Sequence, residues 1–189
     1  MSATAQNLTG LGFPPALADR IDNNRDGINS VNNAAPVTSY FSLNYVPQTG
    51  SSGTSVTASV TTEYLAEVFI PVNATITGLA LLNGGTAAGN VTLTLYDTAG
   101  NLLAQTASTA QSGTNVLQSI PLTAPYAAAG PARYFVGASF NNATATFLSV
   151  TLGVGKCGTL TGQTYGTFPS PITAPTAFAA NAAPIIGTY

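Results

Sequence analysis

Glu63 and Glu67 form the acidic pair that comes closest to a catalytic arrangement in this sequence. Glycosidases hold two carboxyl groups roughly 5–9.5 Å apart across the scissile bond. Both glutamates fall in one predicted strand, where four residues span about 13 Å, so their spacing does not suit that reaction. Asp97 stands alone at a predicted turn. The pattern therefore indicates solvated charges on a sheet edge.

The sequence has few residues suited to nucleophilic or metal-assisted catalysis. The chain has one cysteine, Cys157, and neither histidine nor tryptophan. A thiol nucleophile needs a neighbouring base, and the commonest general base and metal ligand is histidine. A single cysteine also forms no disulfide within the chain. We therefore expect a buried or incidental thiol, and a protein that is not an enzyme.

An Asx-rich stretch near the N-terminus is the candidate cation site. It resembles a calcium loop of the EF-hand or dockerin type, with Asp22, Asn24 and Asp26 at ligand positions 1, 3 and 5 and Gly27 at the sharp turn. It departs from that pattern at Asn33, where a bidentate glutamate is expected. Two interpretations stay open: an Asx-rich turn that needs no cofactor, or a Ca²⁺ site.

The composition predicts a folded chain with an almost neutral surface. Hydrophobic residues make up 45% of the 189 residues, which is enough for a buried core. Charged residues make up only 5%, against about 25% in an average soluble domain. A neutral surface protects poorly against association. We therefore expect Thr, Ser, Asn and Gln on the surface, and burial of part of it in an assembly.

Charge and hydropathy also exclude several partners. The four basic residues, Arg20, Arg25, Arg133 and Lys156, are scattered, whereas nucleic-acid binding needs clustered cations. No apolar run approaches the roughly 18 residues of a membrane span, and the first thirty residues lack the layout of a signal peptide. A chain made in a cytoplasm, with the composition of an extracellular surface, points to a virus particle.

The clearest structural signal is a β-hairpin at residues 90–106. Val91, Leu93 and Leu95 alternate with polar or amphipathic residues, which predicts a strand with one face in a core. Asp97-Thr98-Ala99-Gly100 then has a glycine where a turn demands φ > 0. Residues 101–106 return as the second strand.

Further strands are predicted along the rest of the chain. One long strand is expected over 56–70 and ended by Pro71, and another over 74–82. A strand marked by Val116, Ile120 and Leu122 is expected to end at Pro121 and Pro125, and others run over 134–140 and 148–150. Strands at this spacing, separated by Gly, Pro and Asn, indicate an all-β fold, an antiparallel sandwich or barrel.

Residues 1–46 are predicted to form an N-terminal arm with one short α-helix. Proline suits the first turn of a helix, and apolar residues four apart share one face. A helix of about two to three turns is marginal alone, so it must dock on its own domain or on a neighbouring subunit. The docking residues are predicted to be Leu11, Phe13, Pro14, Pro15, Leu17 and Ile21.

Residues 8–18, Leu-Thr-Gly-Leu-Gly-Phe-Pro-Pro-Ala-Leu-Ala, resemble the N-terminal arm of virion structural proteins of tailed bacteriophages. Residues 130–137 are similar to a stretch of jelly-roll accessory modules. The resemblance implies a jelly-roll-like β-sandwich that acts as a head-decoration or cement protein. It implies a location in the virion and contacts with the major capsid protein, with other virion subunits and with further copies of this chain.

Residues 47–189 are predicted to form the sandwich domain, including an extended C-terminal segment from Gly153. Its last residues either close their own sheet or are donated to a neighbour. The C-terminal contact residues are predicted to be Phe168, Ile172, Phe178, Ile185, Ile186 and Tyr189.

An alternative function is a carbohydrate-binding or adhesion module of a phage tail or cell surface. Tyrosine rings on an exposed face stack on sugars, although tyrosines that point inward usually belong to a core. The candidate stacking residues are Tyr64, Tyr96, Tyr126, Tyr134 and Tyr165.

Overall fold

A computed structural model describes residues 40–42, 53–151, 153 and 155–189. The chain divides into two compact units, Met1–Val37 and Thr38–Tyr189, and every described residue belongs to the second. The described part is all-β, and its strands pair antiparallel throughout. The predicted N-terminal helix lies outside the described residues.

The strands form three antiparallel ladders. The first has the order β1-β13-β4-β8, the second β12-β10-β2, and the third β11-β3-β9-β5-β6 with β7 beside β5. The bounds are β1 (Tyr40–Phe41), β2 (Thr54–Thr57), β3 (Thr62–Ile70), β4 (Ala74–Leu82), β5 (Asn90–Tyr96), β6 (Leu102–Gln105), β7 (Thr109–Ala110), β8 (Leu117–Ala128), β9 (Ala132–Phe140), β10 (Thr146–Val150), β11 (Cys157–Thr161), β12 (Ala183–Pro184) and β13 (Ile186–Thr188).

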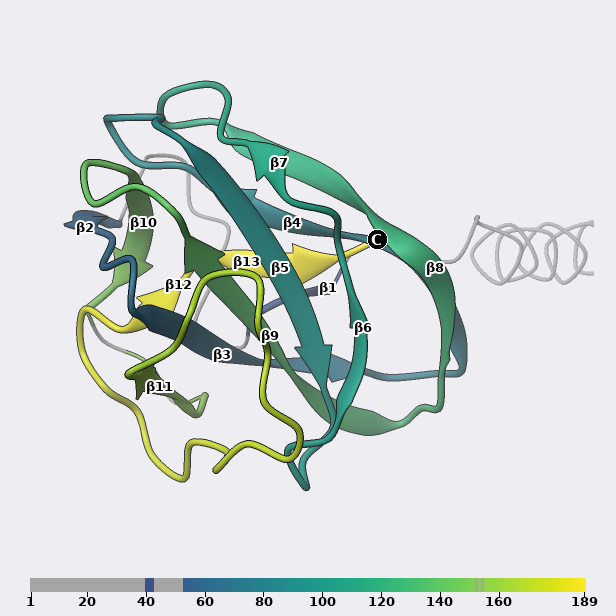
Figure 1. The fold of residues 1–189 in the computed structure, drawn as a ribbon. Helices are drawn as coiled ribbons and strands as arrows, with labels where there is room; N and C mark the ends of the chain where they lie inside the picture. Colours follow the sequence, from purple (N-terminus) through teal and green to yellow (C-terminus); the bar gives the residue numbers. More distant parts are fainter. Residues whose placement is uncertain (1–39, 43–52, 152, 154) are drawn as a thin grey trace, which may run out of the picture. The chain divides into compact units, whose positions relative to one another are not determined.

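The ladders lie in two layers, in the manner of a β-sandwich. In Figure 1 the ladder containing β3, β9 and β5 lies in front of β4, β13 and β1, and the segment that follows β11 crosses in front of it. Single bridges join the layers at both edges, Ser42 to Val68 and Thr106 to Leu122. β12 and β13 are separated only by Ile185, so the other two ladders share the rear layer.

The main core lies between the layers and follows the two-residue period of the strands. Val91, Leu93 and Leu95 of β5 are fully buried in it, as the hairpin predicted. Phe140 stacks on Phe147 with ring centroids 5.6 Å apart. Only alternate residues of the front layer point into this core. The residues on its other face must therefore be covered by another part of the chain.

The β5–β6 hairpin closes as predicted. Asp97 Oδ1 accepts hydrogen bonds from the N–H groups of Ala99 and Asn101, at 2.9 and 2.8 Å. Gly100 has φ +89°, which a side chain would disfavour. Slight burial would raise the pKa of the Asp97 carboxyl. The hydrogen bonds outweigh this effect because they favour the ionised form, so the pKa lies below its ordinary value.

The single strand predicted over residues 56–70 is wrong. A turn interrupts it: the Thr62 N–H donates to the Ser59 carbonyl at 3.3 Å, and the hydroxyls of Ser59 and Thr61 lie 3.2 Å apart. β2 then pairs with β10 whereas β3 pairs with β9, so the two halves belong to different ladders. Pro71 does end β3, as predicted.

The prediction that Pro121 and Pro125 end a strand is also wrong. β8 runs through both prolines, because it is an edge strand whose outer side has no ladder to complete. The cost is local: its register with β4 shifts between Ile76 and Gly78, which pair with Tyr126 and Pro121. Residues 122–125 bulge away from β4.

Candidate functional site

Glu63 and Glu67 lie on the outer face of β3, and their side chains are 0% and 1% exposed. The prediction that they are solvated edge charges is therefore wrong. The two-residue period of a strand separates the two faces of a sheet, but it does not show that the chain's own C-terminal segment covers the second face. Leu65 separates the two glutamates on that face.

Glu63 reaches across β9 to β5. Its Oε1 accepts a hydrogen bond from Thr94 Oγ1 at 2.5 Å, and its Oε2 accepts one from the Tyr96 hydroxyl at 3.2 Å. This crossing needs Gly137 in β9, because a Cβ there would clash with Glu63 Oε1 and Thr94 Oγ1. The glycine thus makes room for the carboxylate over the middle strand.

Burial is the main influence on the titration of this cluster. It raises the pKa of Glu63 above the ordinary 4.5, while the hydrogen bonds from Thr94 and Tyr96 oppose the shift. The pKa of Tyr96 is raised as well, by burial and by the nearby Glu63 charge. The pair is a buried cross-link between β3 and β5, and its carboxyl is enclosed on all sides by the chain.

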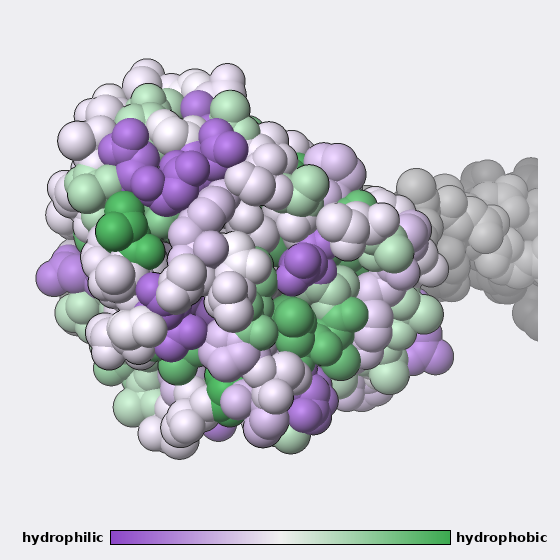
Figure 2. Space-filling model, viewed as in Figure 1, coloured by the Kyte–Doolittle hydropathy of each residue, from purple (hydrophilic) through white to green (hydrophobic). Residues whose placement is uncertain are grey.

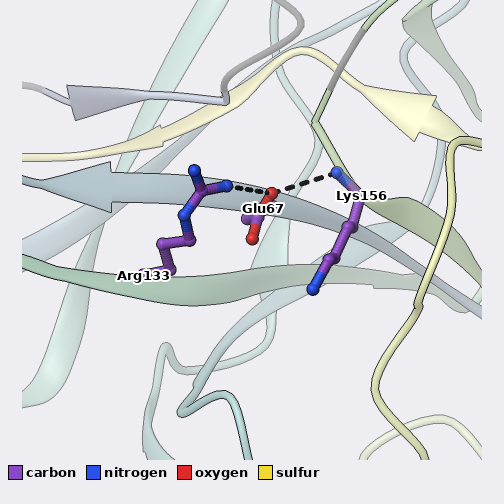
Figure 3. A network of polar contacts seen from close by, with 3 residues as sticks. All are labelled: Glu67, Arg133 and Lys156. Carbon is purple, nitrogen blue, oxygen red and sulfur yellow. Dashed lines mark hydrogen bonds and ion pairs between the residues drawn. The ribbon is translucent and has the colours of Figure 1, made fainter.

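Glu67 sits in a second polar network, shown in Figure 3. Its Oε2 accepts from Arg133 Nη1 at 2.9 Å and from the backbone N–H of Lys156 at 3.1 Å. Its Oε1 is buried and has no hydrogen-bond partner among the described residues. The Arg133 side chain is 53% exposed, so one partner of this ion pair reaches solvent.

The segment after β11 covers the outer face of the front layer. Ile172 is buried there against Leu65, Tyr96 and Phe135, which form a second apolar cluster. Its N–H donates to the Gly100 carbonyl at 2.8 Å, which ties the segment to the turn after β5. The backbone of this segment is irregular, and residues 162–182 contain no strand.

The end of the chain closes its own sheet rather than leaving it. β13 lies between β1 and β4, and the Tyr189 ring rests over Gly78. Ile172, Ile185 and Ile186 are buried within the chain, and their predicted role in a C-terminal interaction stays a prediction. Phe168, Phe178 and Tyr189, the other predicted C-terminal contacts, are half-buried.

The tyrosines proposed for sugar stacking do not form an exposed platform. Tyr64, Tyr96 and Tyr134 are at most 7% exposed, so that prediction is wrong for them. Tyr126 packs edge-on against Tyr134 with ring centroids 6.4 Å apart. The Tyr165 hydroxyl accepts from Thr92 Oγ1 at 3.1 Å and lies 2.8 Å from the Ser108 hydroxyl, which fastens the C-terminal segment.

Cys157 is buried, as predicted. Its Sγ lies 3.2 Å from the N–H and 3.3 Å from the carbonyl oxygen of Ala179. Burial raises the pKa of the thiol, so it is a poor nucleophile at neutral pH. Through these contacts with Ala179, the thiol helps to anchor the C-terminal segment at β11.

A shallow groove opens between β6 and β8, with a volume of about 270 Å³. Figure 2 shows apolar surface over the middle of β6. The sequence patterns did not mark it, although two prolines inside a strand-like stretch are a signal for an irregular edge. Its lining residues are Leu102, Leu103, Ala104, Gln105, Thr123, Ala124 and Pro125.

The predicted N-terminal sites fall outside the described residues. These are the helix docking residues and the possible Ca²⁺ ligands Asp22, Asn24 and Asp26. Among residues 40–42, 53–151, 153 and 155–189, no group of three or more His, Cys, Asp or Glu side chains could hold a metal ion. In the same residues no helix is long and apolar enough to cross a membrane.

Charge is nearly absent from the surface of the described sandwich. Its charged side chains are Glu63, Glu67, Asp97, Arg133 and Lys156, and the two glutamates are buried. Large apolar side chains are exposed to solvent instead: Val72 is 53%, Val116 52% and Leu117 41% exposed.

Comparisons of this chain with protein-family models, curated proteins and solved structures found no match.

Proposed function

We propose that this chain is a structural subunit of a larger protein shell, a virion protein of the head-decoration or cement type. It works by occupying a place in the lattice, without turnover. The jelly-roll-like topology, the N-terminal arm with its helix and the contacts with capsid subunits and further copies belong to this proposal. The resemblance of residues 8–18 to the N-terminal arms of phage virion proteins supports the choice of a tailed-phage particle.

The supporting observation is the distribution of charge. The chain carries only ten charged side chains, four basic and six acidic, and two of the acidic ones are buried beneath the C-terminal segment. The sandwich surface that remains has three charged side chains, Asp97, Arg133 and Lys156, among the described residues. Such a surface resists association poorly and desolvates at little electrostatic cost.

The energetics of a repeated contact are sufficient. An interface of about 800 Å² per partner, at roughly 25 cal/mol per Å² of apolar area, gives a gross gain of the order of tens of kcal/mol. This gross gain does not convert into affinity, because lost translational and rotational freedom, the ordering of side chains and imperfectly paired polar groups offset most of it. A weak single contact becomes tight when it is repeated over a lattice.

The test is binding to undecorated particles. Purified protein is mixed with expanded heads of the source particle and sedimented at 0.05 M and 0.5 M salt. We expect co-sedimentation at micromolar protein, changed little by salt, because few exposed charges are there to be screened. Protein that stays in the supernatant at both salt concentrations would contradict the proposal.

The matched variants are Val116→Lys and Ser112→Lys. Both add one lysine near the same end of the sandwich, but Val116 is a large exposed apolar residue and Ser112 is polar. If apolar surface is used, Val116→Lys weakens sedimentation more than Ser112→Lys does. Equal binding of both variants would place the contact on another surface.

A further inference from the structure

β2 is the last strand of its ladder, and its outer edge is open. It pairs with β10 over four residues in one continuous register, and no strand of the described part of the chain lies on its other side. Figure 1 shows β2 at the left margin, beside β10. Three of its residues are exposed, and the fourth, Val56, is half-buried. An edge strand of this kind presents unpaired peptide groups to solvent.

The hydrogen bonds of β2 alternate between β10 and solvent. The Ala58 N–H donates to the Ala145 carbonyl at 2.8 Å, so the peptide groups of Ala58 face β10. An antiparallel ladder bonds every second residue, and this one has no register shift, so Val56 faces β10 as well. The peptide groups of Ser55 and Thr57 therefore point away from β10.

The bonds on the far side of β10 agree with this alternation. Leu148 and Thr146 of β10 lie opposite Ser55 and Thr57. Their carbonyl groups accept hydrogen bonds at 2.9 Å from the residue between β12 and β13 and from the loop after β4, so they are turned away from β2. Within the described residues, nothing is hydrogen-bonded to the peptide groups of Ser55 and Thr57. A further strand can therefore pair with them without breaking an existing bond.

Other strand edges of the sandwich are blocked by the chain itself. At β6 the Leu102 N–H donates to the Ser170 hydroxyl at 3.0 Å, and at β11 the Cys157 N–H donates to the Ala177 carbonyl at 3.0 Å. β8 contains two prolines, which have no N–H to offer a partner. β2 has neither proline, charged side chain nor bulge, which are the features that keep sheet edges from pairing.

Two copies of β2 are complementary to each other. In an antiparallel pair with its two-fold axis at Val56, Ser55 of one copy lies opposite Thr57 of the other, and both turn their peptide groups toward the partner. Symmetry then repeats the same bonds on the other side of the axis. The strand carries no charge, so identical strands meet without repulsion. A strand from another protein would need the same register and the same neutrality by coincidence, whereas a second copy has both.

We propose that β2 is a contact between two copies of this chain, which pair antiparallel about Val56 and join their rear layers into one continuous sheet. This inference rests on the proposed assembly function and names a contact between copies that serves it. A strand of four residues buries less than the roughly 800 Å² per partner of a standard interface. The pairing is therefore weak in solution and becomes effective where a shell holds the copies together.

The test is sedimentation of the whole purified protein at concentrations from about 10 μM to about 1 mM. We expect a monomer at the lowest concentration and a growing fraction of dimer toward the highest. The dimer fraction should change little between 0.05 M and 0.5 M salt, because the paired edge has no charge to be screened. Protein that is still entirely monomeric at the highest concentration would overturn the proposal.

Two proline variants locate the contact. Thr57→Pro removes an N–H that β10 does not use. Thr159→Pro is the matched control, because Thr159 is also exposed on an edge strand and its N–H faces away from β3, as that of Cys157 does. We expect the first to weaken dimerisation at least about tenfold and the second to leave it unchanged. Equal effects of the two variants would contradict pairing through β2.

A milder pair covers the case in which a proline prevents folding. Thr57→Lys brings two like charges close together across the two-fold axis, whereas Thr159→Lys adds the same charge at β11. We expect the first to lower the dimer fraction at 0.05 M salt, with partial recovery at 0.5 M, and the second to have no effect. Dimerisation of Thr57→Lys equal to that of Thr159→Lys would reject the contact.

A disulfide trap tests the register. Val56 of each copy lies at the axis in a non-hydrogen-bonded pair, with Cα atoms about 4.5 Å apart, which a disulfide can span. Val60→Cys is the control, because Val60 is 37% exposed near the same edge but lies four residues from the axis. We expect copper-catalysed air oxidation to link Val56→Cys into dimers and to leave Val60→Cys largely monomeric. Equal yields would show that the copies do not pair about Val56.

The outcomes separate this inference from the proposed function. If the unmodified protein stays monomeric but binds undecorated heads, and Thr57→Pro binds them as well as Thr159→Pro does, the contact is wrong and the function stands. If the protein dimerises through β2 but ignores heads, the contact stands and the function falls.

Discussion

The two faces of the front layer are buried by different means. The inner face packs against the rear layer through regular alternation, with Leu93 and Phe140 fully buried. The outer face is buried by an irregular segment and holds carboxyl and hydroxyl groups among its apolar side chains, such as Glu63 beside Tyr96. Buried polar groups need partners on either face, but the inner core is almost entirely apolar whereas the outer face holds both buried carboxyl groups.

The largest expected effect contrasts the two faces directly. Phe140→Ala should lower the free energy of unfolding by about 3–5 kcal/mol, because two packed sheets collapse little into a cavity. Phe135→Ala on the outer face should cost less, since the irregular segment carrying Ile172 can settle into the space. Urea unfolding of both variants measures this. Equal losses would mean that the segment packs as rigidly as a sheet.

Next in size is the effect of a side chain at the crossing point. Gly137→Ala should destabilise the protein by about 1–3 kcal/mol, because the new methyl group meets Glu63 and Thr94. Gly158→Ala is the matched control on β11, since its nearest atoms belong to Pro175 and lie at ordinary contact distances. Thermal unfolding of the two variants compares them. A tolerated Gly137→Ala would show that Glu63 is not held in place.

Removal of the exposed partner of Glu67 should have a smaller effect. Arg133→Ala leaves a buried carboxylate that has lost its ion pair, and we expect a loss of about 1–2 kcal/mol, reduced by the exposure of Arg133 to solvent. Glu67→Gln combined with Arg133→Ala should recover part of it. Chemical denaturation of the single and double variants gives the coupling. A double variant less stable than Arg133→Ala would contradict this account.

The smallest expected effect is a pH dependence of the outer face. The folded pKa of Glu63 is raised above 4.5, so the folded protein holds this proton more tightly than the unfolded chain does. Its contribution to stability is complete below about pH 4.5 and is lost as the pH rises through the folded pKa. Glu63→Gln should flatten this slope. Unfolding curves between pH 4 and 8 test it, and an unchanged slope would show that another group titrates.

Local patterns predicted most of the strands. The hairpin of β5 and β6 was predictable, since alternation and the Asp97–Gly100 turn agree with each other. The same period misled at residues 56–70, because a turn at Ser59 keeps the alternation while moving the chain to another ladder. Proline suggested an end to β8, but an edge strand has no partner on one side to lose.

The site was less predictable than the fold. Nothing in the spacing of Glu63 and Glu67 indicates burial, since both alternate with apolar residues as solvated positions do. Their burial comes from residues about a hundred positions later, where Ile172 and its neighbours cover the sheet. The groove beside β6 likewise borders the part of β8 where the pairing of β8 with β4 shifts register, and that pairing is not written in the local pattern.

For the part of the chain that the structure describes, the sequence by itself determined a β-rich fold, most of its strands, a tight turn after β5 and a surface with little charge. These follow from side-chain period, turn chemistry and composition, which act within a few residues. Only the tertiary structure decided which strands share a sheet, that the last strand closes its own layer, and that two glutamates lie beneath the C-terminal segment. Those outcomes depend on contacts between distant parts of the chain, where the burial of whole faces outweighs any local preference.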